Sequence, residues 1–456
     1  MQKGVIPLIF LATLVALPCM AQVFKPTPPP VELSDGDSFV FIGDSITHQC
    51  LYTQYVEDYF YTRYPEKRIH FRNAGVGGDT AQEVLVRFDN DIAAFNPRYA
   101  TILIGMNDGE YTEFSHEIFG RYKKAMTAVL DRLDALGAAA IPMTPTMFDL
   151  RQALGKDDRD DAERPKEADY NGTLSLFGMW CLRQANARGL GFVNMFEPLN
   201  RVTREQRAND PNFTIIRDTV HPDAPGQLVM ALALLEDIGA SPVVSTIEVV
   251  QENGHWVVEA DGGKLSDVGE DTIAFTFTAD SLPWVIPEEG RLGFEITNAS
   301  HRMSRETLKV FGLDSGEYEL RIDGKTVATF AGWELGQGVE LQEMDRTPQY
   351  AQALRVAELN KARNDEAIRP MRDRWAWLKE MRLRNTELKV GIHEEEDEEE
   401  QLGEWRRPIT DEKLAGFIVE HKKVTAELEK KAMEMEDEIF RINTPEPHRY
   451  ELVRVN

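Results

Sequence analysis

The fold is decided by the stretch Ser38-Phe39-Val40-Phe41-Ile42-Gly43-Asp44-Ser45-Ile46-Thr47. It predicts a short apolar strand that runs into a tight Gly-Asp-Ser corner, and a helix pattern begins at Ile46. A serine at such a corner lies at the carboxyl edge of a sheet and at the start of a helix, where backbone N–H groups are free to face an anion. Taken alone, Gly-Asp-Ser is more often a polar turn, so the rest of the chain decides.

Strand and helix patterns alternate for some 200 residues around this corner. The candidate strands are 39–42, 69–71, 100–104, 139–143 and 191–195, and the helix patterns are 47–64, 80–95, 114–136, 167–188 and 224–238. The strands are continuous apolar runs, as parallel strands buried on both faces require. This order predicts a layered α/β domain with right-handed crossovers over residues 35–240, and ligands in such sheets bind at the carboxyl ends of the strands.

The pattern changes after residue 240. Residues 241–340 contain alternating segments joined by Asn253-Gly254 and by Asp323-Gly324, which are strong hairpin signals, so a small antiparallel β region is expected. Residues 341–456 are charged and helical, with two apolar stripes separated by the acidic run 393–400. They predict a helical hairpin that packs on the domain or, alternatively, a pair of helices that forms a homo-oligomer.

Composition limits the partners of the chain. It has 456 residues, 42% of them apolar, and a formal net charge of −26. The length suggests two or three domains, and the acidic balance argues against nucleic acid or an anionic membrane as a partner, because both need basic surface. Cys50 and Cys181 follow the N-terminal segment, and the sequence leaves their pairing open.

The first 21 residues have the pattern of an export signal. Lys3 precedes an apolar run over 5–17, and small side chains at positions 19 and 21 suit a signal peptidase. The run is too short to span a membrane. We expect cleavage after Ala21, a Pro-rich leader at 22–34 and a periplasmic or secreted protein; lipidation at Cys19 is the alternative, which Pro18 disfavours.

Four blocks in the α/β part carry residues suited to chemistry. They are Gly43-Asp44-Ser45, Asn73-Ala74-Gly75-Val76-Gly77-Gly78-Asp79-Thr80, Gly105-Met106-Asn107-Asp108 and Asp218-Thr219-Val220-His221. The glycines of the second block let the backbone approach a ligand, and Asn107 at a strand end can aim its amide at a developing oxyanion. Asp218 can accept the Nδ1 proton of His221 while Nε2 faces a hydroxyl group.

Each block alone also has a purely structural interpretation. The second is consistent with a Gly-rich turn, the third with a turn that uses Asn and Asp locally, and the fourth with a capped turn and an exposed histidine. A dinucleotide-binding loop is less consistent with the second block, because its spacing departs from Gly-x-Gly-x-x-Gly and it follows the second strand. Among nine histidines, His221 alone has an acid at this spacing just before a predicted helix.

Four such blocks in this order resemble the SGNH hydrolases, also called the GDSL family of serine esterases and lipases. The resemblance covers about residues 35–240 and is absent from the C-terminal half. It implies a flavodoxin-like three-layer α/β/α sandwich with a parallel sheet, here followed by the antiparallel β region and the charged helices. It also implies ester hydrolysis without a cofactor.

The resemblance assigns roles residue by residue. Ser45 would be the nucleophile, His221 the base that activates it and Asp218 the residue that orients the imidazole. Asp44 would stabilise the corner. The interpretation from the residues agrees, because a carbonyl attacked by a serine develops a negative oxygen that hydrogen-bond donors can hold.

The same resemblance implies three donors for that oxygen. They are the backbone N–H groups of Ser45 and Gly78 and the side chain of Asn107. Gly78 matches because it precedes Asp-Thr; Gly75 and Gly77 are weaker candidates.

Other hydrolytic classes fit less well. An α/β-hydrolase needs a Gly-x-Ser-x-Gly elbow, which Ser45 lacks. A metal hydrolase needs a motif such as His-Glu-x-x-His or a Cys/His cluster, and the sequence has neither, so no metal is expected. His393 beside the acidic run is better explained as part of a solvated loop.

The family acts on acetylated sugars, lysophospholipids, thioesters and simple esters. Substrate choice would lie in the loops after the strands, for which Glu110, Tyr111 and Asp149 are candidates. The segment 144–164 is polar and charged, which favours a sugar-like substrate over a long acyl chain. We therefore expect an exported carbohydrate O-deacetylase. The alternatives are a lysophospholipase or thioesterase on the same residues, or a non-catalytic binding or assembly protein.

Overall fold

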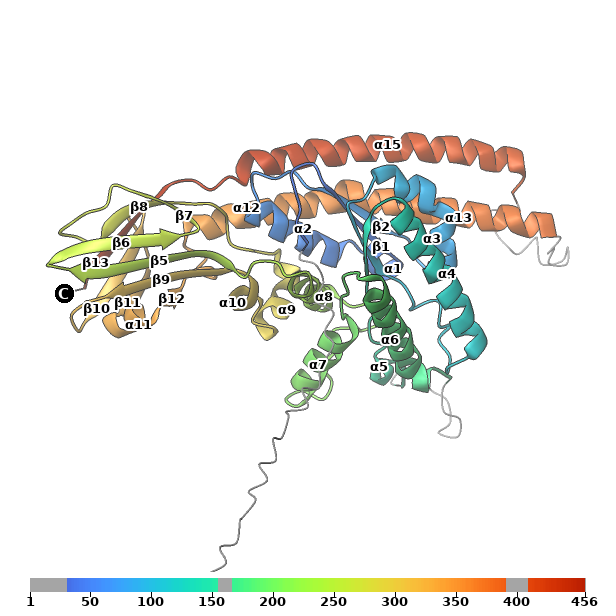
Figure 1. The fold of residues 1–456 in the computed structure, drawn as a ribbon, viewed down its shortest axis with the longest axis horizontal. Coiled ribbons are helices and arrows are strands. Elements are labelled where there is room, and N and C mark those ends of the chain that lie inside the picture. The colour runs from blue at the N-terminus through green and yellow to red at the C-terminus, as the bar shows by residue number, and fades with distance from the viewer. Residues whose placement is uncertain (1–30, 155–165, 391–408, 456) are drawn as a thin grey trace, which may run out of the picture.

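The computed structural model describes residues 31–154, 166–390 and 409–455 (Figure 1). The predicted signal peptide, most of the Pro-rich leader, the later part of the segment 144–164 and the acidic run 393–400 lie outside the described residues. The α/β part lies at one end of an elongated molecule and the β region at the other, and long helices extend from beside the β region along the α/β part (Figure 1).

The α/β part is built on a parallel sheet of order β2-β1-β3-β4. Its strands are β1 (Ser38–Gly43), β2 (His70–Gly75), β3 (Tyr99–Leu103) and β4 (Ala139–Pro142). They are buried on both faces, as their continuous apolar runs require. The fifth strand expected at 191–195 is reduced to one parallel bridge between Met143 and Val193.

Helices cover both faces of this sheet. They are α1 (Ser45–His48), α2 (Leu51–Arg63), α3 (Ala81–Asp91), α4 (His116–Ala135), α5 (Leu150–Leu154), α6 (Tyr170–Arg188), α7 (Phe196–Arg207) and α8 (Ala224–Asp237). Phe39 and Phe41 of β1 pack with α2 and α8, whereas Val40 and Ile42 pack with α3, α4 and α6. The predicted three-layer α/β/α sandwich is therefore confirmed.

Two local features differ from the sequence prediction. The helix expected over 47–64 is divided into α1 and α2, because Cys50 adopts a left-handed conformation with φ of 62°. Helix α7 was not expected.

Cys50 and Cys181 are both buried free thiols.

The β region consists of two sheets that share one apolar core. One has the order β12-β9-β5-β6 and the other β11-β10-β13-β8-β7. The strands are β5 (Val243–Glu252), β6 (His255–Asp261), β7 (Gly263–Ser266), β8 (Ala274–Ala279), β9 (Arg305–Phe311), β10 (Glu317–Ile322), β11 (Lys325–Ala331), β12 (Val339–Glu340) and β13 (His448–Arg454). The short helices α9 (Arg291–Ile296), α10 (Ala299–Met303) and α11 (Gly332–Gln337) lie between them in sequence.

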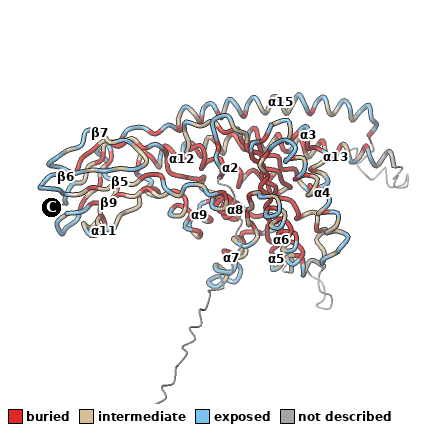
Figure 2. The backbone as a smooth tube through the Cα atoms, in the orientation of Figure 1, coloured by how far each residue is buried: buried red, intermediate tan, exposed pale blue. Residues whose placement is uncertain are grey.

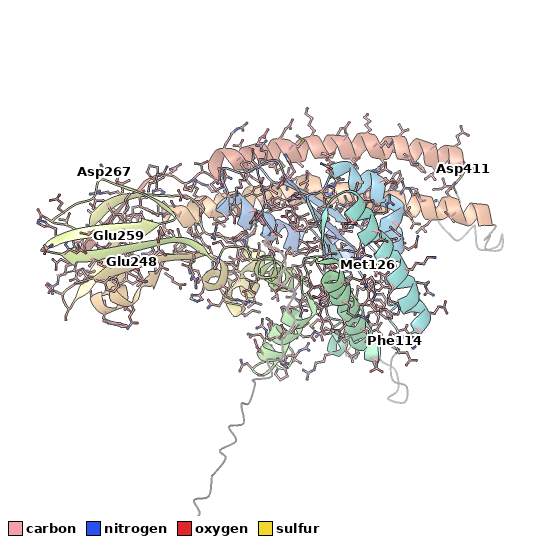
Figure 3. All side chains as sticks on the ribbon, viewed as in Figure 1. Phe114, Met126, Glu248, Glu259, Asp267 and Asp411 are labelled. Atoms are coloured by element: carbon pink, nitrogen blue, oxygen red, sulfur yellow. The ribbon has the colours of Figure 1, made fainter. Side chains whose placement is uncertain are left out.

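Both predicted hairpins form. Asn253-Gly254 joins β5 to β6 and Asp323-Gly324 joins β10 to β11, with positive φ at all four positions. Acidic side chains project from the β5–β6 hairpin, where Glu248 and Glu259 are register partners (Figure 3). The region is not purely antiparallel, because β5 pairs with β9 in parallel.

The end of the chain departs from the expectation that residues 341–456 are helical. Strand β13 returns to the β region and inserts between β8 and β10, antiparallel to both. Tyr450 of this strand is buried and stacks on Phe275 with ring centroids 5.2 Å apart. The C-terminal segment thus completes a sheet that begins about 200 residues earlier.

The remaining C-terminal elements form a helical hairpin on the α/β part. One arm contains α12 (Pro348–Arg363), a π-helical turn (Asn364–Ile368) and α13 (Arg369–Val390); the other is α15 (Asp411–Ile442). Most of α15 is exposed, whereas α12 and α13 bury one side against the molecule (Figure 2). Within the described ranges, no helix has the length and apolar character needed to cross a membrane.

Candidate active site

The carboxyl ends of three neighbouring strands bring the first three blocks together. Gly43, the last residue of β1, is the register partner of Gly75 on β2 and of Leu103 on β3. Ser45 and Asn107 lie in the loops that follow Gly43 and Leu103, and the second block contains Gly75. Parallel strands therefore place all three blocks at one edge of the sheet, as the sequence predicts.

Ser45 is connected to the fourth block by an unbroken hydrogen-bond chain. Its Oγ lies 2.8 Å from Nε2 of His221, and Nδ1 of His221 lies 2.7 Å from Oδ2 of Asp218. The Ser45 side chain begins α1, where the carboxylate of Asp44 accepts the Ile46 N–H and caps the helix. This order of hydroxyl, imidazole and carboxylate can activate a serine for nucleophilic attack.

The Asp218 carboxylate is held by its own loop. Oδ1 accepts the backbone N–H groups of Val220 and His221 at 3.0 and 2.8 Å. Burial alone would raise the pKa of Asp218, but the hydrogen bonds from His221 and Val220 outweigh it and lower the pKa below its usual value. Asp218 therefore remains ionised and fixes the Nδ1–H tautomer of the imidazole.

The loop between Asp218 and His221 is strained at Thr219, and a hydrogen bond from Asp149 stabilises it. Thr219, a β-branched residue, has φ of 88°. Its carbonyl accepts the backbone N–H of Asp149 at 2.9 Å, and the Asp149 carboxylate accepts bonds from Arg207 and Thr214, each at 2.6 Å.

Asp149 is one of the expected substrate-loop residues, and the structure places its side chain inside the protein. The Asp149 side chain is 2% exposed, and its Oδ2 accepts the bonds from both Arg207 and Thr214. Asp149 instead supports the loop that carries the imidazole. Glu110, a second expected substrate residue, is exposed and pairs with Arg121 on the surface.

The hydrogen bonds of the glycine block select one free backbone donor. The N–H groups of Gly75, Val76, Gly77 and Asp79 donate to Asn73 Oδ1, Gly43 O, His48 Nδ1 and Val76 O, respectively. Within the described parts of the chain, the Gly78 N–H has no protein acceptor. Gly78 has φ of 70°, which glycine accepts without strain. The geometry thus favours Gly78 over Gly75 and Gly77.

Asn107 is oriented by contacts at both ends of its amide. Nδ2 donates to the carbonyl of Asp79 at 3.0 Å, and Oδ1 accepts the hydroxyl of Tyr111 at 3.0 Å. The second N–H of Nδ2 remains for a ligand. Burial raises the pKa of Tyr111 to about 12, so the phenol keeps the proton that it donates.

Tyr111 reaches Asn107 because the chain adopts an unusual conformation. Glu110 and Tyr111 both have positive φ, 56° and 50°. Tyr111 is an expected substrate-loop residue, but no sequence pattern indicates its contact with Asn107, because two successive left-handed residues without glycine are uncommon.

Three carboxylates, those of Asp44, Asp79 and Asp108, belong to residues next to these donors in the sequence. Asp79 forms an ion pair with Arg87 at 2.7 Å, and Asp108 accepts the Ala81 N–H at 3.0 Å. Burial raises the pKa of both Asp44 and Asp108 to about 7, and the neighbouring carboxylates add to the increase. In the ranges that the structure covers, no group of His, Cys, Asp or Glu is arranged to hold a metal ion.

Part of the chain is similar to known ester-hydrolysing proteins. A family model described as "GDSL-like Lipase/Acylhydrolase family" matches residues 41–229. An acetylxylan esterase from Geobacillus stearothermophilus is 24% identical over 231 residues, which cover 46% of this chain and 97% of that protein. A solved structure of a catalytic mutant of such an esterase from the same organism covers 46% of this chain and 97% of its own, with 23% identity and a TM-score of 0.37.

A second solved structure is similar over almost the whole chain. A gut microbial diltiazem-metabolizing enzyme superposes with a TM-score of 0.74 over 93% of this chain and 99% of that chain, at 24% identity. This likeness shows that the arrangement of α/β part, β region and helical hairpin recurs in another protein.

Proposed function

We propose that this protein is an exported serine esterase that removes O-acetyl groups from carbohydrate, because residues 41–229 match the GDSL-like lipase/acylhydrolase family. The observation that carries the catalytic part is the chain from Asp218 through His221 to Ser45, with contacts of 2.7 and 2.8 Å. The match to this family supports a carboxylic ester hydrolase. We propose the carbohydrate substrate and the export in addition.

The reaction proceeds through an acyl-enzyme. Ser45 Oγ attacks the ester carbonyl while His221 Nε2 accepts the hydroxyl proton, and the carbonyl oxygen becomes negative. When the ester C–O bond breaks, His221 returns the proton to the leaving alcohol oxygen. Water then repeats the sequence on the acyl group, which leaves as a carboxylic acid and regenerates Ser45. Asp218 stabilises the imidazolium in both halves.

Three donors hold the negative oxygen in this mechanism. They are the N–H groups of Ser45 and Gly78 and the free N–H of the Asn107 amide. Each is fixed before substrate arrives, so that no reorganisation is needed as charge develops. Removing one such donor costs about 10²- to 10³-fold in kcat in comparable sites.

Two features support a short acyl group on a large, hydrated alcohol. The side chains of His221 and Asp218 are 31% and 55% exposed, which leaves room beside the triad for a bulky leaving group. On the side of Asn107, the Tyr111 ring packs against Tyr170 and Phe148 at centroid distances of 5.2 and 6.3 Å. These aromatic rings pack against one another, an arrangement that favours acetyl over a long chain.

The similarity to an acetylxylan esterase favours the same substrate class. Export is proposed from Lys3, the apolar run 5–17 and the small residues before position 22. Recovery of the mature protein, beginning near Gln22, from the periplasm or medium would support it, whereas an uncleaved protein in the cytoplasm would contradict it.

The proposed chemistry is tested with p-nitrophenyl esters and acetylated polysaccharides. We expect Ser45→Ala to fold like the wild type and to lose hydrolysis of p-nitrophenyl acetate and release of acetate from plant or algal polysaccharides. Activity that persists in Ser45→Ala would refute the assignment of the nucleophile. Absence of labelling by a fluorophosphonate would favour a binding or assembly protein instead.

Acyl-chain length separates the two esterase hypotheses. A steep preference for acetyl over octanoyl or palmitoyl esters is the expected result. A preference for long chains would contradict deacetylation and favour a lysophospholipase or thioesterase on the same triad.

A further inference from the structure

The peptide group between Gly77 and Gly78 determines where the second oxyanion donor points. Its C=O belongs to Gly77 and its N–H to Gly78, and the two point in opposite directions because the peptide is planar and trans. Glycine on both sides leaves this peptide free to rotate at little steric cost. A contact that holds the Gly77 carbonyl therefore also fixes the direction of the Gly78 N–H.

That contact comes from helix α13, some 300 residues later in the chain. Lys379 Nζ donates to the carbonyl of Gly77 at 3.2 Å. The same ammonium lies 3.0 Å from Oδ1 of Asp79 and 3.2 Å from Oε1 of Glu83, and the side chain is only 22% exposed. The two carboxylates keep the ammonium in place over the Gly77 carbonyl.

The other side of Gly77 is linked to α13 indirectly, through His48. The Gly77 N–H donates to Nδ1 of His48 at 3.2 Å, and Nε2 of His48 lies 3.0 Å from the carboxylate of Asp373. Because Nδ1 accepts, Nε2 carries the proton and donates to Asp373. Burial lowers the pKa of His48, which favours this neutral form.

Helix α13 is itself anchored beside the block by Arg372. Its Nε donates to the carbonyl of Gly75 at 2.9 Å, and its guanidinium forms a two-pronged pair with Asp91. Arg372 and Asp91 are both completely buried. The helix thus meets the glycine block through Arg372, Asp373 and Lys379, all on one side of α13.

We propose that Lys379 is a positioning residue that holds the Gly77–Gly78 peptide with its N–H directed at the oxyanion, so that the C-terminal helix α13 completes the active site of the α/β part. The inference rests on the proposed function. Lys379 itself does not contact the reacting atoms. Its loss leaves the triad and the Asn107 donor intact but lets the peptide rotate, which withdraws one of the three donors.

The test measures steady-state hydrolysis of p-nitrophenyl acetate by the full chain, with active sites counted by fluorophosphonate titration. We expect Lys379→Met to lower kcat per titrated site by about 10- to 100-fold and to change KM by less than about twofold, because only the transition state loses a donor. Lys379→Arg, which keeps a donor and a positive charge, should recover most of the lost kcat.

Lys431→Met is the matched control. Lys431 lies on α15 and pairs with Glu366 at 2.8 Å in an exposed position, so its loss should leave kcat and KM unchanged. If Lys379→Met does not fold, Lys379→Gln is measured instead, since its side chain is shorter and has no positive charge for Asp79 and Glu83 to hold in place.

The two proposals fail in different ways. A wild-type protein without Ser45-dependent hydrolysis overturns the proposed function and this inference with it. If the wild type is active but Lys379→Met has the wild-type kcat per titrated site, only the inference is overturned. The same holds if the loss of activity equals the loss of titratable sites, because Lys379 would then contribute to folding alone.

Discussion

Two of the three proposed oxyanion donors, the Asn107 amide and the Gly78 N–H, are oriented by very different parts of the chain. Asn107 is oriented by Tyr111, four residues later, within the loop that follows β3. The Gly77–Gly78 peptide is held by Lys379, 302 residues later, on a helix outside the segment that matches the hydrolase family. One donor is supported locally and the other by a distant element.

This difference shows how an added region can become part of a site without supplying a reacting group. Helix α13 shares a buried ion network with the α/β part, in which Arg72, Arg87 and Arg372 surround Asp91. Burial alone would raise the pKa of Asp91, but Arg372 and the other two guanidinium groups lower it far below its usual value. The helix is therefore anchored by charges that water does not screen.

The largest effect is expected where this anchor is broken. Arg372→Met leaves Asp91 with less than its full set of partners and removes the bond to the Gly75 carbonyl. Loss of one member of a buried ion pair costs about 3–5 kcal/mol when the other charge is left alone. Because Asp91 keeps Arg72 and Arg87, the free energy of unfolding in urea should fall by about 3 kcal/mol, the lower end of this range.

Arg374→Met on the same helix is the matched variant. Arg374 pairs at 3.1 Å with Glu420 of α15, whose side chain is 55% exposed, so the expected cost is about 1 kcal/mol or less. Equal losses for the two variants would contradict the view that α13 is anchored inward, through Asp91, rather than outward.

Removing the hydrogen bond from Tyr111 to Asn107 should give a smaller effect, seen in the kinetics alone. Tyr111→Phe removes the hydroxyl that donates to Asn107 Oδ1 and keeps the ring that packs on Tyr170. We expect kcat for p-nitrophenyl acetate to fall about 10-fold with KM little changed, because the amide is still present but less well oriented.

Asn107→Ala sets the upper limit for this comparison, since it removes the donor itself. Tyr99→Phe is the control: its hydroxyl contacts the Glu32 carbonyl at the start of the described chain, and its loss should not alter kcat. If Tyr111→Phe is as active as the wild type, the Asn107 amide does not need the Tyr111 hydroxyl. The contrast between a donor supported locally and one supported by Lys379 then disappears.

The same contrast explains what the sequence could predict. The four blocks are each only a few residues long, and strand order brings them to one edge, so Ser45, Asn107, Asp218 and His221 were named from local patterns. The layered α/β domain follows from the alternation of apolar strands and helices, and the three-layer sandwich is what the family resemblance implies. Both hairpins of the β region follow from Asn-Gly and Asp-Gly.

Contacts between distant segments could not be predicted in this way. Lys379 lies in a charged helix whose periodicity indicates an apolar stripe but not which loop its lysines meet. Asp149 was assigned to substrate because its segment is polar, but its burial depends on Arg207, 58 residues later. Strand β13 was missed because its partners β8 and β10 lie far away in sequence and no turn signal joins it to them.

A pH-dependent effect is expected at Asp108, which follows Asn107 and accepts the Ala81 N–H just after the glycine block. Burial raises its pKa to about 7 from an ordinary value of 3.8. Between about pH 4 and 7 the folded protein therefore binds more protons than the unfolded chain, so its free energy of unfolding falls as pH rises through this window. The contribution of one group is at most about 1.4 kcal/mol per pH unit.

Asp108→Asn keeps an oxygen to accept the Ala81 N–H but cannot ionise. We expect its stability, measured by urea unfolding from pH 4 to 8, to fall less steeply than that of the wild type and to exceed it above pH 7. Glu110→Gln, an exposed acid two residues away, should leave the wild-type slope unchanged. A slope that is the same in Asp108→Asn and the wild type would mean that Asp108 ionises as readily in the folded protein as in water. The Asp108 carboxylate would then not behave as a buried group between Asn107 and the glycine block.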